Sequence, residues 1–176
     1  MKPLKLIYQT MVDTLNQSQL ISYFVDHLNR IYCAKEHIVA RFPVFAKHAS
    51  FKDIRYAIEE TVEDIEKQIE RMRHIYKLLS VQPETGPCLG LTALLDEAAA
   101  AIKQETDDIM LRDMAILFYL QNIESTEVGS FQVLKMVARK IGNEEINQLL
   151  LENFDESRDD RNLLLQLTDK YLPKGI

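Results

Sequence analysis

Four long stretches of the sequence repeat apolar side chains at the spacing of an α-helix, and this periodicity restricts the chain to few folds. The stretches are residues 19–47, 51–79, 109–141 and 143–171. In the first, the repeating side chains are Phe24, Leu28, Ile31, Ile38, Phe42 and Phe45. Intervals of three, four and seven place such side chains on one helix face. The chain has only five glycines and five prolines, so few residues interrupt these helices. We therefore predict an all-α protein.

The lengths of the connections between the stretches indicate the topology. The first and second stretches are joined by a tight turn, as are the third and fourth. Between these two hairpins lies a loop rich in proline and glycine, followed by an expected short helix at residues 91–104. One long crossover of this kind is typical of ferritin-like bundles. We predict a single domain over residues 1–176: a ferritin-like four-helix bundle (19–171) with a crossover helix and an accessory N-terminal helix (1–17).

Local signals predict where some of these helices begin and end. Ser18 is a candidate N-cap for the first long helix, because a serine hydroxyl can accept from backbone amides that lack a partner. Gly142 is a candidate stop for the third, because glycine tolerates the left-handed conformation found at helix ends.

Charge and cysteine content exclude several functional classes. The net charge is −6 and basic residues alternate with acidic ones, so we expect no nucleic-acid partner. No apolar run is long enough for a membrane span, and the first residues lack the apolar core of a signal peptide. Cys33 and Cys88 show neither a metal-binding spacing nor a disulfide framework. We expect Cys33 to serve packing and the chain to be cytoplasmic.

Polar residues interrupt the apolar stripes of all four long helices near their midpoints. We predict that they form a buried network in the bundle core: Lys35, Thr61, Asp64, Gln68, Glu124, Glu127, Ser157 and Asp160. A buried charge without a partner costs several kcal/mol, so these groups should be paired or should bind an ion. In ferritin-like dimetal proteins, inward-facing glutamates and Glu-x-x-His motifs hold the metals.

The Glu-x-x-His motif of dimetal proteins is absent from this sequence. The residues three positions before its four histidines are Phe24, Ala34, Phe45 and Arg71. A lysine instead occupies the core stripe of the first helix. Nearby carboxylates favour the charged form of a buried amine. We therefore predict that Lys35 stays charged and takes the electrostatic place of a metal.

Three short motifs resemble the YciE/YciF ferritin-like family, bacterial stress-associated proteins often described as ferroxidases. They are Tyr32-x-Ala34, Gln68-Ile69-Glu70-Arg71 and Glu124-x-x-Glu127, in that order along the chain. The resemblance covers roughly residues 24–167 and implies the ferritin-like fold, a stress-associated role and a dimetal site. At three positions where the family has a glutamate or a histidine, this chain has Lys35, Thr61 and Ser157.

Two main functional hypotheses follow, and a third is a scaffold that acts through its outer helix faces. In the first, the chain is a non-catalytic, stress-associated bundle with a degenerate, metal-free site and no cofactor. In the second, it is a metal-dependent oxidase or ferroxidase. Its metal ligands would then be Asp64, Glu124, Glu127, Glu156 and Asp160. Hard oxygen ligands suit iron or manganese, and also magnesium or calcium. Because ferritin-like proteins commonly pair along their flat helical faces, we also expect a homodimer.

Overall fold

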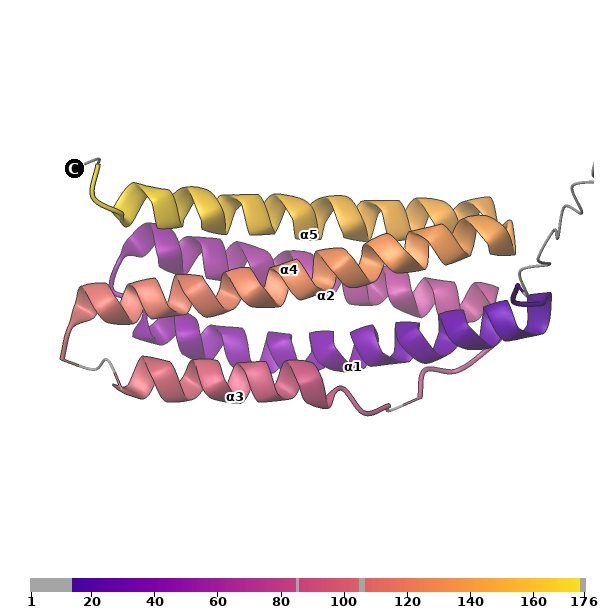
Figure 1. The fold of residues 1–176 in the computed structure, drawn as a ribbon, viewed down its shortest axis with the longest axis horizontal. Coiled ribbons are helices and arrows are strands. Elements are labelled where there is room, and N and C mark those ends of the chain that lie inside the picture. Colours follow the sequence, from indigo (N-terminus) through magenta and orange to yellow (C-terminus); the bar gives the residue numbers. More distant parts are fainter. Residues whose placement is uncertain (1–13, 85, 105–106, 175–176) are drawn as a thin grey trace, which may run out of the picture.

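The computed structural model describes residues 14–84, 86–104 and 107–174, and this part of the chain folds into five α-helices without strands (Figure 1). The helices are α1 (Gln17–His48), α2 (Lys52–Leu78), α3 (Leu89–Gln104), α4 (Ile109–Ile141) and α5 (Glu144–Tyr171). Their ends lie within two residues of the predicted bounds. The predicted accessory helix at 1–17 falls almost entirely outside the described residues, and residues 14–16 are not helical.

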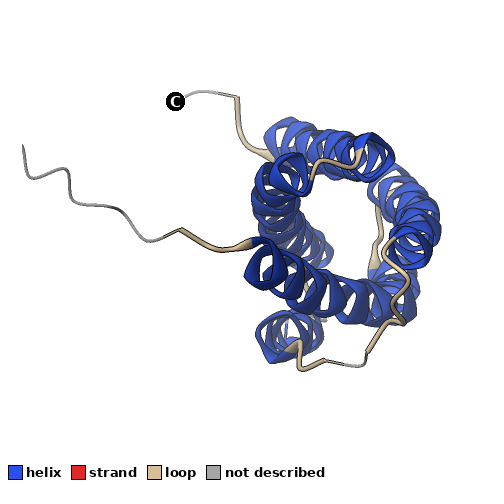
Figure 2. Cartoon of the chain, turned by 90° about the vertical axis from the view of Figure 1, so that its right-hand side faces the viewer, coloured by secondary structure: helices blue, strands red, loops and turns tan. Residues whose placement is uncertain are grey.

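Four of the helices form a ring around one core, and the all-α, ferritin-like prediction is confirmed. Helix α1 packs against α2 and α4, and α5 packs against the same two helices. Figure 2 shows this ring in end view, with α3 outside it. Neighbouring helices of the ring run antiparallel, and α3 returns the chain along the length of the bundle (Figure 1). It lies against α1 and α4. No helix among the described residues is both long and apolar enough to cross a bilayer.

The structure shows which residues cap the start of α1 and the end of α4. Asn16 caps α1, accepting from the amide of Gln19 at 2.9 Å, while the Gln19 side chain accepts from the amide of Asn16 at 3.0 Å. This reciprocal capping box leaves Ser18 inside the first turn, so its prediction as the cap was wrong. Gly142 ends α4 with a φ of 82°, as predicted from its tolerance of left-handed geometry.

The start of α2 is capped from a different helix. Phe51 occupies the N-cap position and offers no capping side chain. Instead, the carboxylate of Asp113 on α4, which is almost fully buried, accepts from the amides of Ser50 and Phe51, each at 2.8 Å. These bonds join the turn between α1 and α2 to α4, and they satisfy backbone donors that the helix cannot satisfy itself.

We predict that Asp113→Ala destabilises the protein by about 2–3 kcal/mol, because it leaves two amide donors without an acceptor. Urea denaturation followed by circular dichroism would measure the change. Asp159→Ala, which removes an exposed aspartate paired with Arg158, is the matched control and should change stability by less than about 0.5 kcal/mol. Equal effects of the two substitutions would contradict the capping role of Asp113.

Candidate functional site

A band of polar side chains interrupts the otherwise apolar core of the bundle, and we call it the polar layer. All of its members are buried, and each of the four ring helices contributes at least one. They are Lys35, Thr61, Gln68, Glu124, Glu127, Asn153, Ser157 and Asp160. Asp64, which we had placed in this network, is instead partly exposed and pairs with Lys67 at 2.7 Å. Asn153 was not in the predicted network.

Lys35 lies at the centre of the polar layer with no solvent-exposed surface. Its Nζ donates to the Glu127 carboxylate on α4 and, at 2.5 Å, to Oε1 of Gln68 on α2. The ammonium also lies 5.0 Å from the centroid of the Phe131 ring, which adds a cation–π contact. One lysine thus connects three helices of the ring.

Helix α5 joins the layer through Gln68 and Arg71 of α2. Ser157 Oγ lies 3.5 Å from Gln68 Oε1, and Asn153 Nδ2 donates to the backbone carbonyl of Gln68 at 3.3 Å. Next to them, the guanidinium of Arg71 binds both carboxylate oxygens of Glu156 at 2.6 Å. Such a bidentate arginine–carboxylate pair is among the stronger ionic contacts in proteins.

Two other carboxyl groups of the layer have raised pKa values. Burial raises the pKa of Glu124 well above its usual value, the negative charge of Glu127 raises it further, and Lys35 opposes the change. Burial also raises the pKa of Asp160 to about 7, with repulsion from Asp64 as the next cause. Burial therefore favours the protonated form of Glu124, and near neutral pH Asp160 is close to its titration midpoint.

The five carboxylates that were candidate metal ligands do not assemble into a metal centre in this structure. Among the described residues, no three of them bring ligand oxygens within 4.8 Å of one another. Three are held by cations: Glu127 by Lys35, Glu156 by Arg71 and Asp64 by Lys67. These residues do not fit a dimetal group as they stand, because each ion pair would have to break first.

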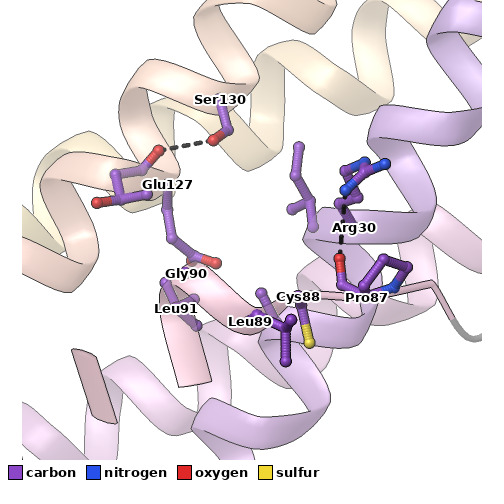
Figure 3. A pocket seen from close by; sticks show the side chains of 11 residues that line it. Arg30, Pro87, Cys88, Leu89, Gly90, Leu91, Glu127 and Ser130 are labelled. Atoms are coloured by element: carbon purple, nitrogen blue, oxygen red, sulfur yellow. Dashed lines mark hydrogen bonds between the residues drawn. The ribbon is translucent and has the colours of Figure 1, made fainter. Parts of the chain in front are cut away.

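A pocket of about 430 Å³ reaches the edge of the polar layer from the side of α3 (Figure 3). Glu127 forms part of its wall, opposite the segment from Pro87 to Leu91 that leads into α3. One oxygen of Glu127, Oε1, has no hydrogen-bond partner among the described residues. The pocket is otherwise mostly apolar, lined by side chains such as Ile31 and Ala34.

The two cysteines are joined, which corrects our expectation that they form no disulfide. Cys33 on α1 and Cys88, directly before α3, form a disulfide with a Cα–Cα distance of 6.1 Å. The two cysteines are 55 positions apart in the sequence, and this separation gave no signal, because the crossover connection alone brings Cys88 back to α1. The disulfide also removes one of the observations on which the expected reducing, cytoplasmic location rested.

Comparison with known proteins identifies the family. Residues 19–175 match DUF892, described as a domain of unknown function. The chain belongs to this family. It is 23% identical to Protein YciF of Escherichia coli strain K12 over 145 residues, which are 82% of this chain and 87% of YciF. The predicted resemblance to YciE/YciF proteins is therefore confirmed.

Two solved structures share the fold. The crystal structure of the E. coli stress protein YciF superimposes with a TM-score of 0.83 at 22% identity, covering 89% of this chain and 98% of YciF. YcfI of Rhodopseudomonas palustris, a proposed structural protein, superimposes with a TM-score of 0.79 at 24% identity, covering 90% and 97% of the two chains. At these identities the likeness establishes the fold alone.

We predict that Lys35→Met destabilises the protein by about 3–5 kcal/mol at pH 8, because it leaves the Glu127 carboxylate buried without a cation. The double variant Lys35→Met/Glu127→Gln should recover most of this loss, since it removes both charges. Urea denaturation of the two single variants and the double variant would give the coupling energy. If Lys35→Met left the stability unchanged, or if the double variant were as unstable as Lys35→Met, the result would contradict a buried ion pair.

The raised pKa of Asp160 predicts a pH dependence of stability. Its folded pKa of about 7 exceeds the unfolded value near 3.8, so the protonated group favours folding below pH 4. This contribution is lost as the pH rises through about 7. Asp160→Asn should therefore exceed the wild type in stability at pH 8, by at most about 4 kcal/mol, and should approach it at pH 4.

Urea denaturation at the two pH values would measure this difference. Asp159→Asn, at an exposed neighbouring position, is the matched control and should show no such trend. If Asp160→Asn were less stable than the wild type by the same amount at both pH values, the raised pKa of Asp160 would be refuted.

Proposed function

We propose that the chain is a non-catalytic, stress-associated bundle whose core holds no metal, with the Lys35 ammonium in the electrostatic place of a cation. The observation that carries this proposal is the contact of Lys35 Nζ with Glu127 and Gln68 at the centre of the polar layer. A lysine there supplies positive charge to the carboxylates and repels an incoming dication.

The charge balance of the layer supports the same proposal. The Lys35 cation is matched by the Glu127 anion, while the raised pKa of Glu124 favours the neutral form of that carboxyl group. A divalent cation would need at least two further anions to balance its charge, and recruiting Glu124 and Asp160 for this purpose would displace protons. Such a displacement weakens metal affinity at neutral pH.

The alternative is a dimetal iron or manganese oxidase or ferroxidase using Asp64, Glu124, Glu127, Glu156 and Asp160. It would require Lys67 and Arg71 to release two of these carboxylates and Lys35 to leave the core. The relatives do not favour this alternative, since YciF is described as a stress protein and YcfI as a proposed structural protein. Our expectations of a homodimer, a cytoplasmic location and no nucleic-acid partner stay predictions.

We predict that the wild-type protein retains far less than one metal ion per chain after incubation with Fe(II) or Mn(II) and desalting. Elemental mass spectrometry would measure the retained metal. The disulfide should be kept intact in this experiment, so that thiolates contribute no ligands. Near-stoichiometric iron or manganese in the wild type would instead support the oxidase.

A double variant tests whether the polar layer is an emptied metal site. Lys35→Glu/Thr61→His removes the resident cation and adds two ligands, so it should gain affinity for Fe(II) or Mn(II). Lys77→Glu/Thr126→His makes the same changes at exposed positions and should gain none. If the double variant folds but binds Fe(II) or Mn(II) no better than the wild type, the result would count against the polar layer being an emptied metal site.

A further inference from the structure

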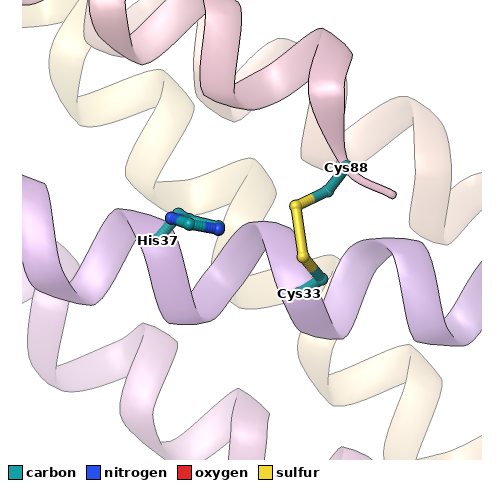
Figure 4. Close-up of side chains that lie close together, drawn as sticks. All are labelled: Cys33, His37 and Cys88. Atoms are coloured by element: carbon teal, nitrogen blue, oxygen red, sulfur yellow. A yellow bond between two sulfur atoms is a disulfide. The ribbon is translucent and has the colours of Figure 1, made fainter. Parts of the chain in front are cut away.

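Cys33, His37 and Cys88 form a cluster of metal-ligating side chains outside the polar layer. Their ligand atoms all lie within 4.8 Å of one another, and no other group of three His, Cys, Asp or Glu residues among the described residues does so. Cys33 and His37 are one helical turn apart on α1, so they share a face, and Cys88 approaches from the start of α3 (Figure 4). His37 is exposed and both cysteines are partly exposed, so an ion in solution can reach them.

The donor set of this cluster differs in kind from that of the polar layer. Two thiolates and one imidazole are soft and intermediate ligands, which suit zinc much better than iron(II) or manganese. Zinc sites with two cysteines and one histidine are known to leave a fourth, tetrahedral position for water. With Zn–S bonds of about 2.3 Å at tetrahedral angles, the two sulfurs would be about 3.8 Å apart. The cysteines therefore need to separate only slightly after the disulfide is reduced.

Contacts that do not involve the disulfide hold Cys88 close to α1. Asn29 of α1 is buried, and its Oδ1 accepts from the Tyr76 hydroxyl at 2.8 Å and from the Glu84 amide at 3.2 Å. The Arg30 guanidinium donates to the carbonyl of Pro87 at 3.4 Å. Because these bonds anchor both ends of the segment that leads to Cys88, the reduced cysteines stay near His37. The three ligands are thus already close to one another before an ion binds.

We propose that the dithiol form of the chain binds one zinc ion through Cys33, His37 and Cys88, and that the disulfide form does not. A dithiol reductant transfers two electrons and two protons to the disulfide and becomes a disulfide itself. Zinc then displaces the two thiol protons and takes the neutral imidazole as its third ligand. In the reverse direction, hydrogen peroxide takes two electrons from the two thiolates and two protons from the solvent and is reduced to two molecules of water. The S–S bond forms and the zinc ion, having lost its sulfur ligands, is released.

This proposal is independent of the proposed function. Lys35 is two residues from Cys33, so the two side chains point about 200° apart around α1. The polar layer lies on the inner face of α1 and the cysteine cluster on its outer face. A failure of either proposal leaves the other unchanged.

The test measures zinc affinity in both redox forms. The protein is reduced with a phosphine, its two thiols are counted, and it is titrated with zinc in anaerobic buffer against a chromophoric chelator. We expect about one zinc ion per reduced chain and none for the oxidised chain. Cobalt(II) in place of zinc should give thiolate-to-metal charge-transfer absorption, which identifies sulfur ligands.

Matched histidine variants test whether the site has three ligands. His37→Ala should weaken zinc binding by about tenfold or more, because one ligand is lost. His74→Ala removes another exposed histidine, which pairs with Glu145 on the opposite side of the fold, and should bind as the wild type does. Cys33→Ser loses one of the two thiolates and should show no zinc binding at concentrations that saturate the reduced wild type.

Three results would each overturn the proposal. They are no zinc uptake by the reduced wild type, equal affinity of His37→Ala and wild type, and equal affinity of the oxidised and reduced forms. Because His37 is exposed, its replacement leaves the core unchanged, and a thermal unfolding curve would verify that the variant is folded.

Discussion

An ammonium group in the middle of a helical bundle must be matched by nearby negative charge and hydrogen-bond acceptors, because burying it alone costs several kcal/mol. Lys35 meets this constraint with Glu127 from α4 and Gln68 from α2, so one side chain fixes the level at which three helices meet. A shift of any of them by one turn, about 5.4 Å, would separate these groups. The remaining carboxyl groups then adjust by their protonation, as the raised pKa of Glu124 shows.

This constraint gives a physical meaning to the differences between the chain and the dimetal pattern. A site that loses ligands but keeps its glutamates would leave buried anions without a cation. Here the position that resembles a family glutamate carries Lys35, and Glu127 binds it directly. In the proposed metal-free site, Lys35 thus supplies the positive charge that the buried Glu127 carboxylate requires, so the lysine follows from electroneutrality.

Helical periodicity, together with the lengths of the connections, was sufficient to predict the fold and the burial of most of the polar layer. The spacing of Phe24, Leu28, Ile31 and Ile38 placed Lys35 on the inner face of α1, where the structure has it fully buried. Periodicity was less informative beside the stripes. Asp64 lies next to the stripe of α2 and pairs with Lys67 near the surface, whereas Asn153, which lies on the stripe of α5, is fully buried. Periodicity also could not choose the partner of Lys35, because side-chain rotamers decide between Glu124 and Glu127.

Helical periodicity could not predict the disulfide between Cys33 and Cys88, for a different reason. Cys33 is one residue off the stripe of α1, which predicts only that it faces away from the centre of the ring. Its partner depends on the path of the crossover connection, and that path depends on contacts such as those of Asn29 with Glu84 and Arg30 with Pro87. Because the crossover must travel the whole length of the bundle, it has to cover the outer face of some helix, and here it covers α1 and α4. Helix α1 therefore carries two separate chemistries: the inner Lys35 cation, which balances the charge of the core, and the outer Cys33, whose disulfide joins the helix to the crossover segment.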